Sequence, residues 1–130
     1  MTDNPWDHVT IWHELMSLDP ERAKMFYQEV IELSTQSLDE SPFPYTILLQ
    51  DGEPMGGLVP PQGKQKGWPS GSKLHWVSSF ATADVDQAVE KAQKLGGEVL
   101  VAPTDIPQFG RAAVLKDLEG AVFGIFQKRK

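Results

Sequence analysis

The sequence contains no cysteine, which excludes disulfide bonds, thiolate nucleophiles and thiolate metal ligands. It also contains no apolar run of about 18 residues, the length that a membrane-spanning helix requires. The first ten residues, MTDNPWDHVT, lack the basic and apolar regions of a signal peptide. These absences predict a cytoplasmic protein that makes no contact with a membrane.

Positive charge is scarce and scattered. The chain has 12 Lys and Arg against 18 Asp and Glu, so its formal net charge is −6. Outside the terminal segment Lys128-Arg129-Lys130 the basic residues form no cluster. A protein that binds nucleic acid needs a basic stripe to displace the counterions of the phosphates. The sequence therefore predicts no nucleic-acid partner.

A repeated pattern of one strand, one helix and three strands fills the 130 residues. Asp19-Pro20 and Asp84-Val85 each follow a strand-like segment and carry helix-start signals, with Asp at the N-cap. The two aspartates are 65 residues apart, half the length of the chain. The expected strands are Val9–Met16, a weak segment at Leu33–Leu38, Tyr45–Gln50, Met55–Val59, Leu74–Thr82, Glu98–Ala102, Arg111–Leu115 and Ala121–Gln127.

We predict an α+β fold in which two tandem βαβββ units form a cupped mixed sheet. Unit one covers about residues 9–59 and unit two about 74–127, joined by a Pro-, Gly- and Ser-rich linker at 60–73, within one domain of residues 1–130. The first helix should run from Pro20 to about Ile31 and turn one apolar stripe to the sheet: Ala23, Phe26, Tyr27 and Val30. The helices cover one sheet face, and the other face lines a cavity or an interface.

Gly124 lies in the middle of the last predicted strand, DLEGAVFGIFQ. Glycine in a strand interior weakens the strand and marks a bulge or a close approach. Two explanations are open at this point. Either Gly124 is a twist or close-packing point without a functional role, or a side chain with a role in related proteins is missing here.

These residues resemble the glyoxalase, bleomycin-resistance and dioxygenase superfamily, also called vicinal oxygen chelate proteins. The resemblance rests on the segment WHELMSLDPERAKMFY (residues 12–27) and on the second-half residues Asp84, Leu95-Gly-Gly97, Pro103, Ile106-Pro107, Gly110-Arg111 and Asp117-Leu-Glu-Gly120. In metal-dependent members each unit contributes a ligand from its first and its last strand. The resemblance places these four positions on Trp12, Gly56, Val77 and Gly124, none of which has a coordinating side chain. It therefore implies a metal-free member without a cofactor.

Alternation along the strands selects the residues that share a face with Trp12, because successive side chains point to opposite sides. Glu14 and Met16 should line the same cavity, together with His75, Val77 and Ser79 of the second unit. Glu14 and His75 form a candidate acid–base pair, since a carboxylate in an apolar site has a raised pKa and histidine titrates near neutral pH. The alternative is that Glu14 is a hydrogen-bonded structural carboxylate and His75 a half-exposed residue.

Two further candidates have competing interpretations. The three histidines, His8, His13 and His75, would form a metal site only if they shared a sheet face, and alternation places His13 opposite His75. Arg111 could supply a cation for an anionic ligand or could pair with a surface acid. Trp68 could cover the cavity as part of a loop.

Three functions remain open from the sequence. The first is metal-independent binding or sequestration of a small apolar or aromatic molecule, with Trp12, Glu14, Met16, Gly56, Val77, Ser79 and Gly124 around it. The second is a metal-free lyase, isomerase or hydroxylase-like enzyme that uses Glu14 as acid or base. The third is a self-associating fold without a dedicated ligand. Members of the family commonly pair two chains, and the open sheet face and its edges also predict a homodimer.

Overall fold

The computed structural model describes residues 5–17, 19–38, 45–59, 76–106 and 109–128. The predicted linker 60–73, with Trp68, and the candidate His75 lie outside the described residues. The elements are η1 (Pro5–His8), β1 (Ile11–Met16), α1 (Pro20–Ile31), β2 (Ser34–Leu38), β3 (Tyr45–Gln50), β4 (Glu53–Val59), β5 (Trp76–Ala81), α2 (Val85–Leu95), β6 (Glu98–Ile106), β7 (Gly110–Lys116) and β8 (Val122–Lys128).

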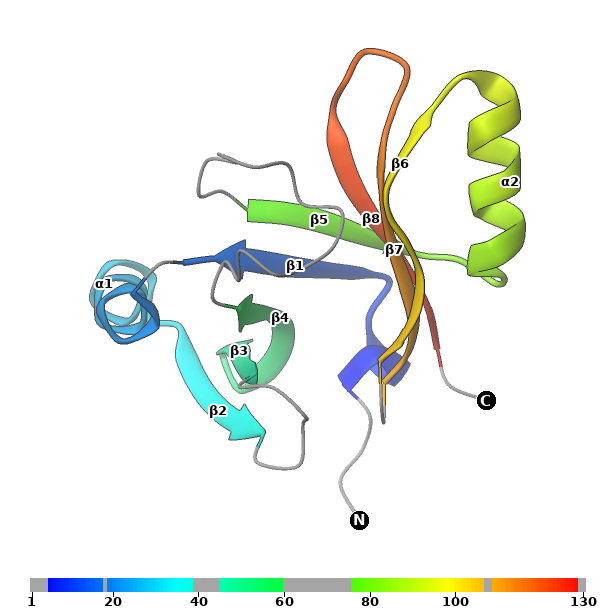
Figure 1. Cartoon of the computed structure of the whole chain (residues 1–130). Helices are drawn as coiled ribbons and strands as arrows, with labels where there is room; N and C mark the ends of the chain where they lie inside the picture. Colours follow the sequence, from blue (N-terminus) through cyan, green and yellow to red (C-terminus); the bar gives the residue numbers. More distant parts are fainter. Residues whose placement is uncertain (1–4, 18, 39–44, 60–75, 107–108, 129–130) are drawn as a thin grey trace.

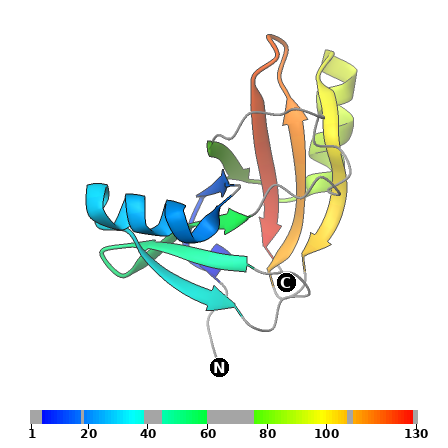
Figure 2. The same cartoon turned by 60° about the vertical axis from the view of Figure 1, so that its left-hand side comes forward.

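The strands form one mixed sheet in the order β2-β3-β4-β1-β5-β8-β7-β6. Strand β1 runs parallel to β4, and β5 runs parallel to β8, whereas β1 and β5 are antiparallel. Figure 1 shows α1 and α2 at opposite ends of the molecule with β1 and β5 running between them, and Figure 2 shows the curvature of the strands. The predicted α+β fold with two βαβββ units is confirmed.

The two units meet in an arrangement close to two-fold symmetric. His13 of β1 pairs with Ser78 of β5, and these residues occupy equivalent positions, 65 residues apart, in the two units. The flanking pairs, Trp12 with Ser79 and Glu14 with Val77, are related by the same exchange. The sequence repeat is therefore a structural repeat, with its pseudo-two-fold axis at the His13–Ser78 pair.

Both helices begin where the sequence predicts. The carboxylate of Asp19 accepts a hydrogen bond from the amide of Arg22, at 3.2 Å, and that of Asp84 accepts one from Gln87, at 3.1 Å. An N-cap carboxylate satisfies one of the amides that have no partner within the helix. These local contacts explain why the helix starts are readable from the sequence.

The predicted packing of α1 is wrong in part. Ala23 and Tyr27 pack against the buried residues Leu15, Leu48 and Leu58 on the sheet. Phe26 and Val30, which we expected on the same surface, are 57% and 58% exposed. A helix advances about 100° per residue, and only part of the apolar stripe reaches the sheet. The stripe on α1 is thus wider than the surface that its own chain covers.

Helix α2 packs more completely. Val85 and Val89 are buried against Ala113, Leu115 and Ile125 of β7 and β8. We call this helix-bearing side of the sheet the outer face and the opposite side the inner face. No helix within the described ranges is long and apolar enough to cross a membrane.

Candidate ligand-binding site

Strand β1 divides its side chains between the two faces, as alternation predicts. Trp12 and Met16 are buried in one cluster on the inner face, whereas Leu15 belongs to the cluster under α1. Glu14 stands between Trp12 and Met16 on the strand and is half-buried. A carboxylate is rarely placed on so apolar a surface without a specific reason. The inner face of β1 is therefore a plausible place for chemistry or recognition.

An aromatic cluster covers the inner face. The ring centroid of Trp6 lies 4.8 Å from that of Phe126, 5.3 Å from that of Phe109 and 6.5 Å from that of Trp12. All four side chains are buried, and Met16 and Ile47 complete the cluster. Tilted and edge-to-face rings at these distances attract one another beyond the burial of their area. Both units contribute to the cluster, with Trp12 and Ile47 from the first and Phe126 from the second.

Sequence reasoning did not identify Trp6 and Phe109. Trp6 belongs to η1, which Figure 1 shows between the two halves of the sheet, on the side away from the helices. Phe109 lies just before β7. The only signal was a tryptophan beside a proline in an otherwise polar N-terminal segment. Neither residue belongs to a periodic stripe, so their packing on the sheet depends on the tertiary fold.

Val77 and Ser79 lie on β5 as the sequence predicts. Val77 is paired with Glu14, and Ser79 is paired with both Trp12 and Gly124. Residues paired in this way share a sheet face. The structure therefore brings Trp12, Glu14, Val77, Ser79 and Gly124 together on the inner face.

The space at Gly124 is taken by Ser79. A Cβ atom added to Gly124 would collide with the Oγ atom of Ser79 and would lie 3.1 Å from its Cβ atom. The φ angle of Gly124 is not positive, so the backbone conformation itself does not require glycine. Of the two explanations left open by the sequence, close packing is the one that the structure shows at Gly124, where the Ser79 side chain fills the space.

The equivalent of Gly124 in the first unit is Gly57 and not Gly56. Glu14 pairs with Gly57 just as its repeat mate Ser79 pairs with Gly124. Gly56 is aligned with His13, whose carbonyl oxygen a Cβ atom on Gly56 would strike. The expectation that Gly56 lies on the inner face with Trp12 and Glu14 is therefore wrong, and Gly57 is the glycine that pairs with Glu14.

A β-bulge causes this one-residue difference. Leu48 of β3 pairs with Gly56 and Leu49 pairs with Pro54, so Met55 is an extra residue in β4. Gly57 therefore lies five residues after the turn glycine Gly52, whereas Gly124 lies four residues after the turn glycine Gly120. Because side chains alternate, a shift of one residue changes the sheet face.

The four positions at which metal-dependent relatives carry ligands have no side chain here that could bind a divalent metal ion. Trp12, Val77, Gly124 and either Gly56 or Gly57 offer no imidazole or carboxylate. Across the described ranges no group of three or more His, Asp and Glu side chains gathers as a metal site. His13, one of the three histidines considered from the sequence, instead lies near Ser78, with its Nδ1 atom 3.4 Å from the Ser78 Oγ atom.

Arg111 is engaged by two carboxylates. Its Nε and Nη2 atoms donate to Asp86 of α2 at 2.8 and 3.0 Å, and its Nη1 atom donates to Asp105 of β6 at 2.9 Å. The hydrogen bonds from Arg111 lower the pKa of Asp86, and those to Asp86 and Asp105 raise the pKa of Arg111. Arg111 thus links the start of α2 to β6 and β7. Of its two predicted roles, pairing with surface acids is the one confirmed.

Comparison with known proteins now identifies the family. A model of the glyoxalase, bleomycin resistance protein and dioxygenase superfamily matches residues 6–125. The chain belongs to this superfamily. Both predicted units lie almost entirely within the matched range, so the resemblance seen in the sequence motifs is confirmed.

Several superfamily members resemble the chain over most of its length. A Mycobacterium tuberculosis protein named as a glyoxylase, CFP32, is 36% identical over 118 residues, which are 90% of this chain and 43% of that protein. The anthracycline biosynthesis protein DnrV of Streptomyces peucetius is 29% identical over 126 residues, covering 90% of this chain and 46% of that protein. The chain thus spans less than half the length of these relatives.

Solved structures agree on the fold. Methylmalonyl-CoA epimerase from Streptomyces coelicolor has a TM-score of 0.64 and 19% identity, covering 94% of this chain and 99% of that chain. A homoprotocatechuate 2,3-dioxygenase variant from B. fuscum has a TM-score of 0.63 and 18% identity, covering 93% of this chain and 32% of that chain. The glyoxalase-like fold of this chain therefore accompanies different chemistries in other proteins.

Proposed function

We propose that this chain binds a small apolar or aromatic molecule at the inner face, without a metal ion. The observation that carries the proposal is the aromatic cluster of Trp6, Trp12, Phe109 and Phe126 on the side of the sheet opposite α1 and α2. Small-molecule sites combine apolar and aromatic walls with a few polar groups. Among the described residues that the sequence assigned to this face, Glu14 and Ser79 carry the polar side chains.

The relatives support an aromatic ligand. DnrV is named as an anthracycline biosynthesis protein, and anthracyclines are planar polycyclic aromatic molecules. A planar ring system packs well against indole and phenyl faces. A neutral ligand also avoids repulsion from a chain with a net charge of −6.

Equilibrium dialysis with 1,8-dihydroxyanthraquinone, a neutral planar tricycle, tests the proposal. We expect saturable binding with a dissociation constant in the micromolar range. Ser79→Leu places a branched side chain on the inner face and should weaken binding at least tenfold. Phe80→Leu, at the next residue on the outer face, is the matched control and should leave it unchanged. No saturable binding, or equal binding by both variants, would contradict the proposal.

A metal-free enzyme that uses Glu14 is the second candidate. It is favoured by the half-buried position of this carboxylate between Trp12 and Met16. A carboxylate near a bound apolar molecule can accept or donate a proton. If a compound retained in the dialysis experiment is also converted, Glu14→Gln should abolish conversion while preserving retention. Conversion that survives Glu14→Gln would exclude this role.

A further inference from the structure

Trp6 lies at the centre of the aromatic cluster on the inner face. Its ring contacts the rings of Phe126, Phe109 and Trp12. Only 4% of Trp6 is exposed, whereas the next residue, Asp7, is exposed. The part of the inner face where we propose that a ligand binds is therefore occupied by a ring of the chain itself.

The segment that carries Trp6 is not part of the sheet. It is the short 3-10 helix η1, of four residues, and the register of β1 with β5 begins after it, at Ile11. The carbonyl oxygen of Thr10 accepts a hydrogen bond from the amide of Ala81 at 2.9 Å, which holds the chain just before β1. Short helical segments outside a strand ladder open at a lower free energy than the strands do. Helix η1 can thus leave the inner face while β1 keeps its pairing.

The side chains around Trp6 are held by the two βαβββ units and not by η1. All of them are buried, and they come from strands of both units or from the residue just before β7: Trp12 and Met16 of β1, Ile47 of β3, Phe109 before β7 and Phe126 of β8. These walls keep their positions when η1 moves, because the sheet fixes them. An apolar space that a protein ring vacates takes up a flat apolar molecule more readily than water.

A ligand ring can make the contacts that Trp6 makes. The indole is tilted or edge-on to its neighbours, with centroids 4.8 Å from Phe126, 5.3 Å from Phe109 and 6.5 Å from Trp12. Flat aromatic molecules attract protein rings in the same geometries. Displacement of Trp6 by such a molecule therefore exchanges one set of ring contacts for another. The remaining cost is the exposure of the indole and of Val9, which is partly buried against the cluster.

We infer that Trp6 is a built-in occupant of the ligand's ring site, and that a flat, fused aromatic molecule without charge binds by displacing it together with η1. This inference rests on the proposed function and names the ligand by its size, two or more fused rings that fill the place of an indole. A single six-membered ring leaves part of that place empty and loses the contacts there. Trp6 thus determines specificity, since the ligand must offer at least as much ring contact as the side chain that it replaces.

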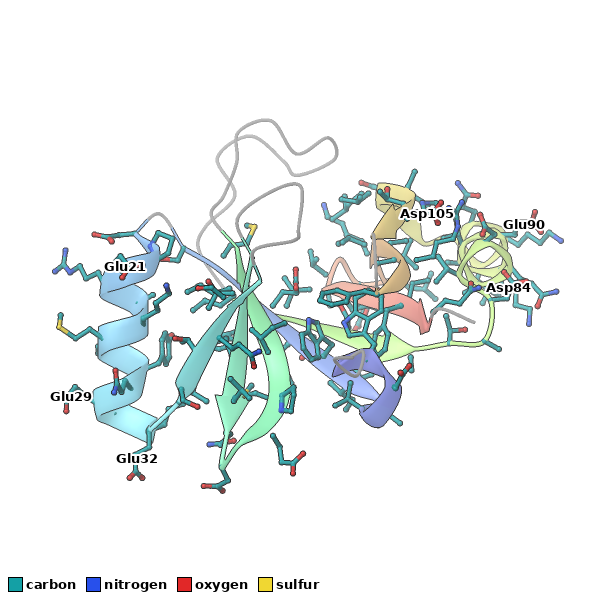
Figure 3. All side chains as sticks on the ribbon, turned by 90° about the horizontal axis from the view of Figure 1, so that it is seen from below. Glu21, Glu29, Glu32, Asp84, Glu90 and Asp105 are labelled. Atoms are coloured by element: carbon teal, nitrogen blue, oxygen red, sulfur yellow. The ribbon has the colours of Figure 1, made fainter. Side chains whose placement is uncertain are left out.

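The distribution of charge supports a ligand without charge. Figure 3 shows six labelled carboxylates toward the two outer ends of the molecule, on and around the helices: Glu21, Glu29, Glu32, Asp84, Glu90 and Asp105. Helix η1 lies between the two halves of the sheet (Figures 1 and 3). A charged ring would give up its hydration there in exchange for apolar walls, which is unfavourable.

Equilibrium dialysis of Trp6→Ala with 1,8-dihydroxyanthraquinone provides the first test. Binding to the wild type is weakened by the fraction of time that Trp6 occupies the site, so Trp6→Ala should bind at least about tenfold more tightly. Trp76→Ala is the matched control, because it removes an indole on the outer face whose Nε1 atom donates to Tyr27 at 3.2 Å, and it should bind like the wild type. In Trp6→Ala, 2-naphthol should compete with the probe and phenol should not. Circular dichroism checks that both variants are folded.

Fluorine NMR follows Trp6 in the wild-type chain and does not depend on the folding of Trp6→Ala. Incorporation of 5-fluorotryptophan labels all four tryptophans, and the signal that is missing in Trp6→Phe is that of Trp6. A soluble gadolinium chelate should leave this signal sharp in the free chain. It should broaden the signal at saturating 1,8-dihydroxyanthraquinone, because the displaced indole then lies in water.

The outcomes separate the inference from the proposed function. Saturable binding by the wild type with a Trp6 signal that stays protected, or with no gain of affinity in Trp6→Ala, would overturn the inference and leave the proposed function intact. Binding by Trp6→Ala alone would also overturn it, since the ligand would then be unable to displace the indole. An absence of binding by both chains would refute the inference together with the proposed function.

Discussion

Replacing Gly124 by alanine tests the packing between β5 and β8. The new Cβ atom would lie 3.1 Å from the Cβ atom of Ser79 and would strike its Oγ atom. The hydroxyl can rotate away, but the contact between the two Cβ atoms remains unless the strands separate. Overpacking of this kind costs about 1–3 kcal/mol, against a gain of about 0.4–1 kcal/mol from the reduced freedom of the unfolded chain. We expect a net loss of about 1–2 kcal/mol.

A second substitution identifies Ser79 as the cause. Ser79→Gly alone should lower stability by about 0.5–1 kcal/mol, since glycine is unfavourable in a strand. In the double variant the clash is absent, so the two costs should be less than additive, with a coupling of about 0.5–3 kcal/mol. Urea unfolding of the wild type, both single variants and the double variant measures this coupling. Full additivity, or a Gly124→Ala variant as stable as wild type, would refute the steric argument.

Three further predictions concern the helix end, the last turn and the metal. Glu32 ends α1 with a φ angle of 60°, where α2 has Gly96, so Glu32→Gly should stabilise the chain by about 0.5–1 kcal/mol in thermal unfolding; an unchanged Tm would contradict this. Hydrogen bonds from the amides of Ala121 and Glu119 lower the pKa of the Asp117 carboxyl. The carboxylate therefore stabilises the fold above its unfolded-state pKa, and this stabilisation is lost as pH falls through its folded-state pKa. The loss of unfolding free energy caused by Asp117→Ala should accordingly shrink between pH 7 and pH 3 in urea unfolding, and a loss that grows would reverse the argument. After dialysis, elemental analysis should find no stoichiometric Ni, Zn, Fe or Mn, and one bound equivalent would show that the donor positions are misassigned.

The features predicted correctly are those that depend on neighbouring residues in the sequence. Asp19 and Asp84 cap their helices through amides three residues away. Because the same local signals occur twice, 65 residues apart, they also indicate the repeat. The repeat then predicts the order of elements in both halves of the sheet.

The candidate site was predicted less completely because two of its features are not local. The bulge at Met55 moves Gly57 into the position expected for Gly56, and no residue in the segment EPMGGLV announces an extra residue. Trp6 reaches the inner face from outside both units. Strand alternation predicts which residues share a face only while the register is regular, and it gives no information on which distant segment covers that face.

Helix α1 shows a third limit. Periodicity marks Phe26 and Val30 as residues that the sheet should cover, yet both are more than half exposed. The pattern of a helix predicts which residues share a stripe, but it does not predict how much of that stripe the sheet reaches. Strand β5 behaves more simply, since Ser79 faces inward and its neighbour Phe80 faces outward. Substitutions one residue apart on β5 should therefore separate the two faces. Ser79→Leu should impair retention of the aromatic probe and Phe80→Leu should leave it unchanged, because only the first side chain lies on the inner face. Equal retention of the probe by both variants would show that the inner face of β5 does not bind it.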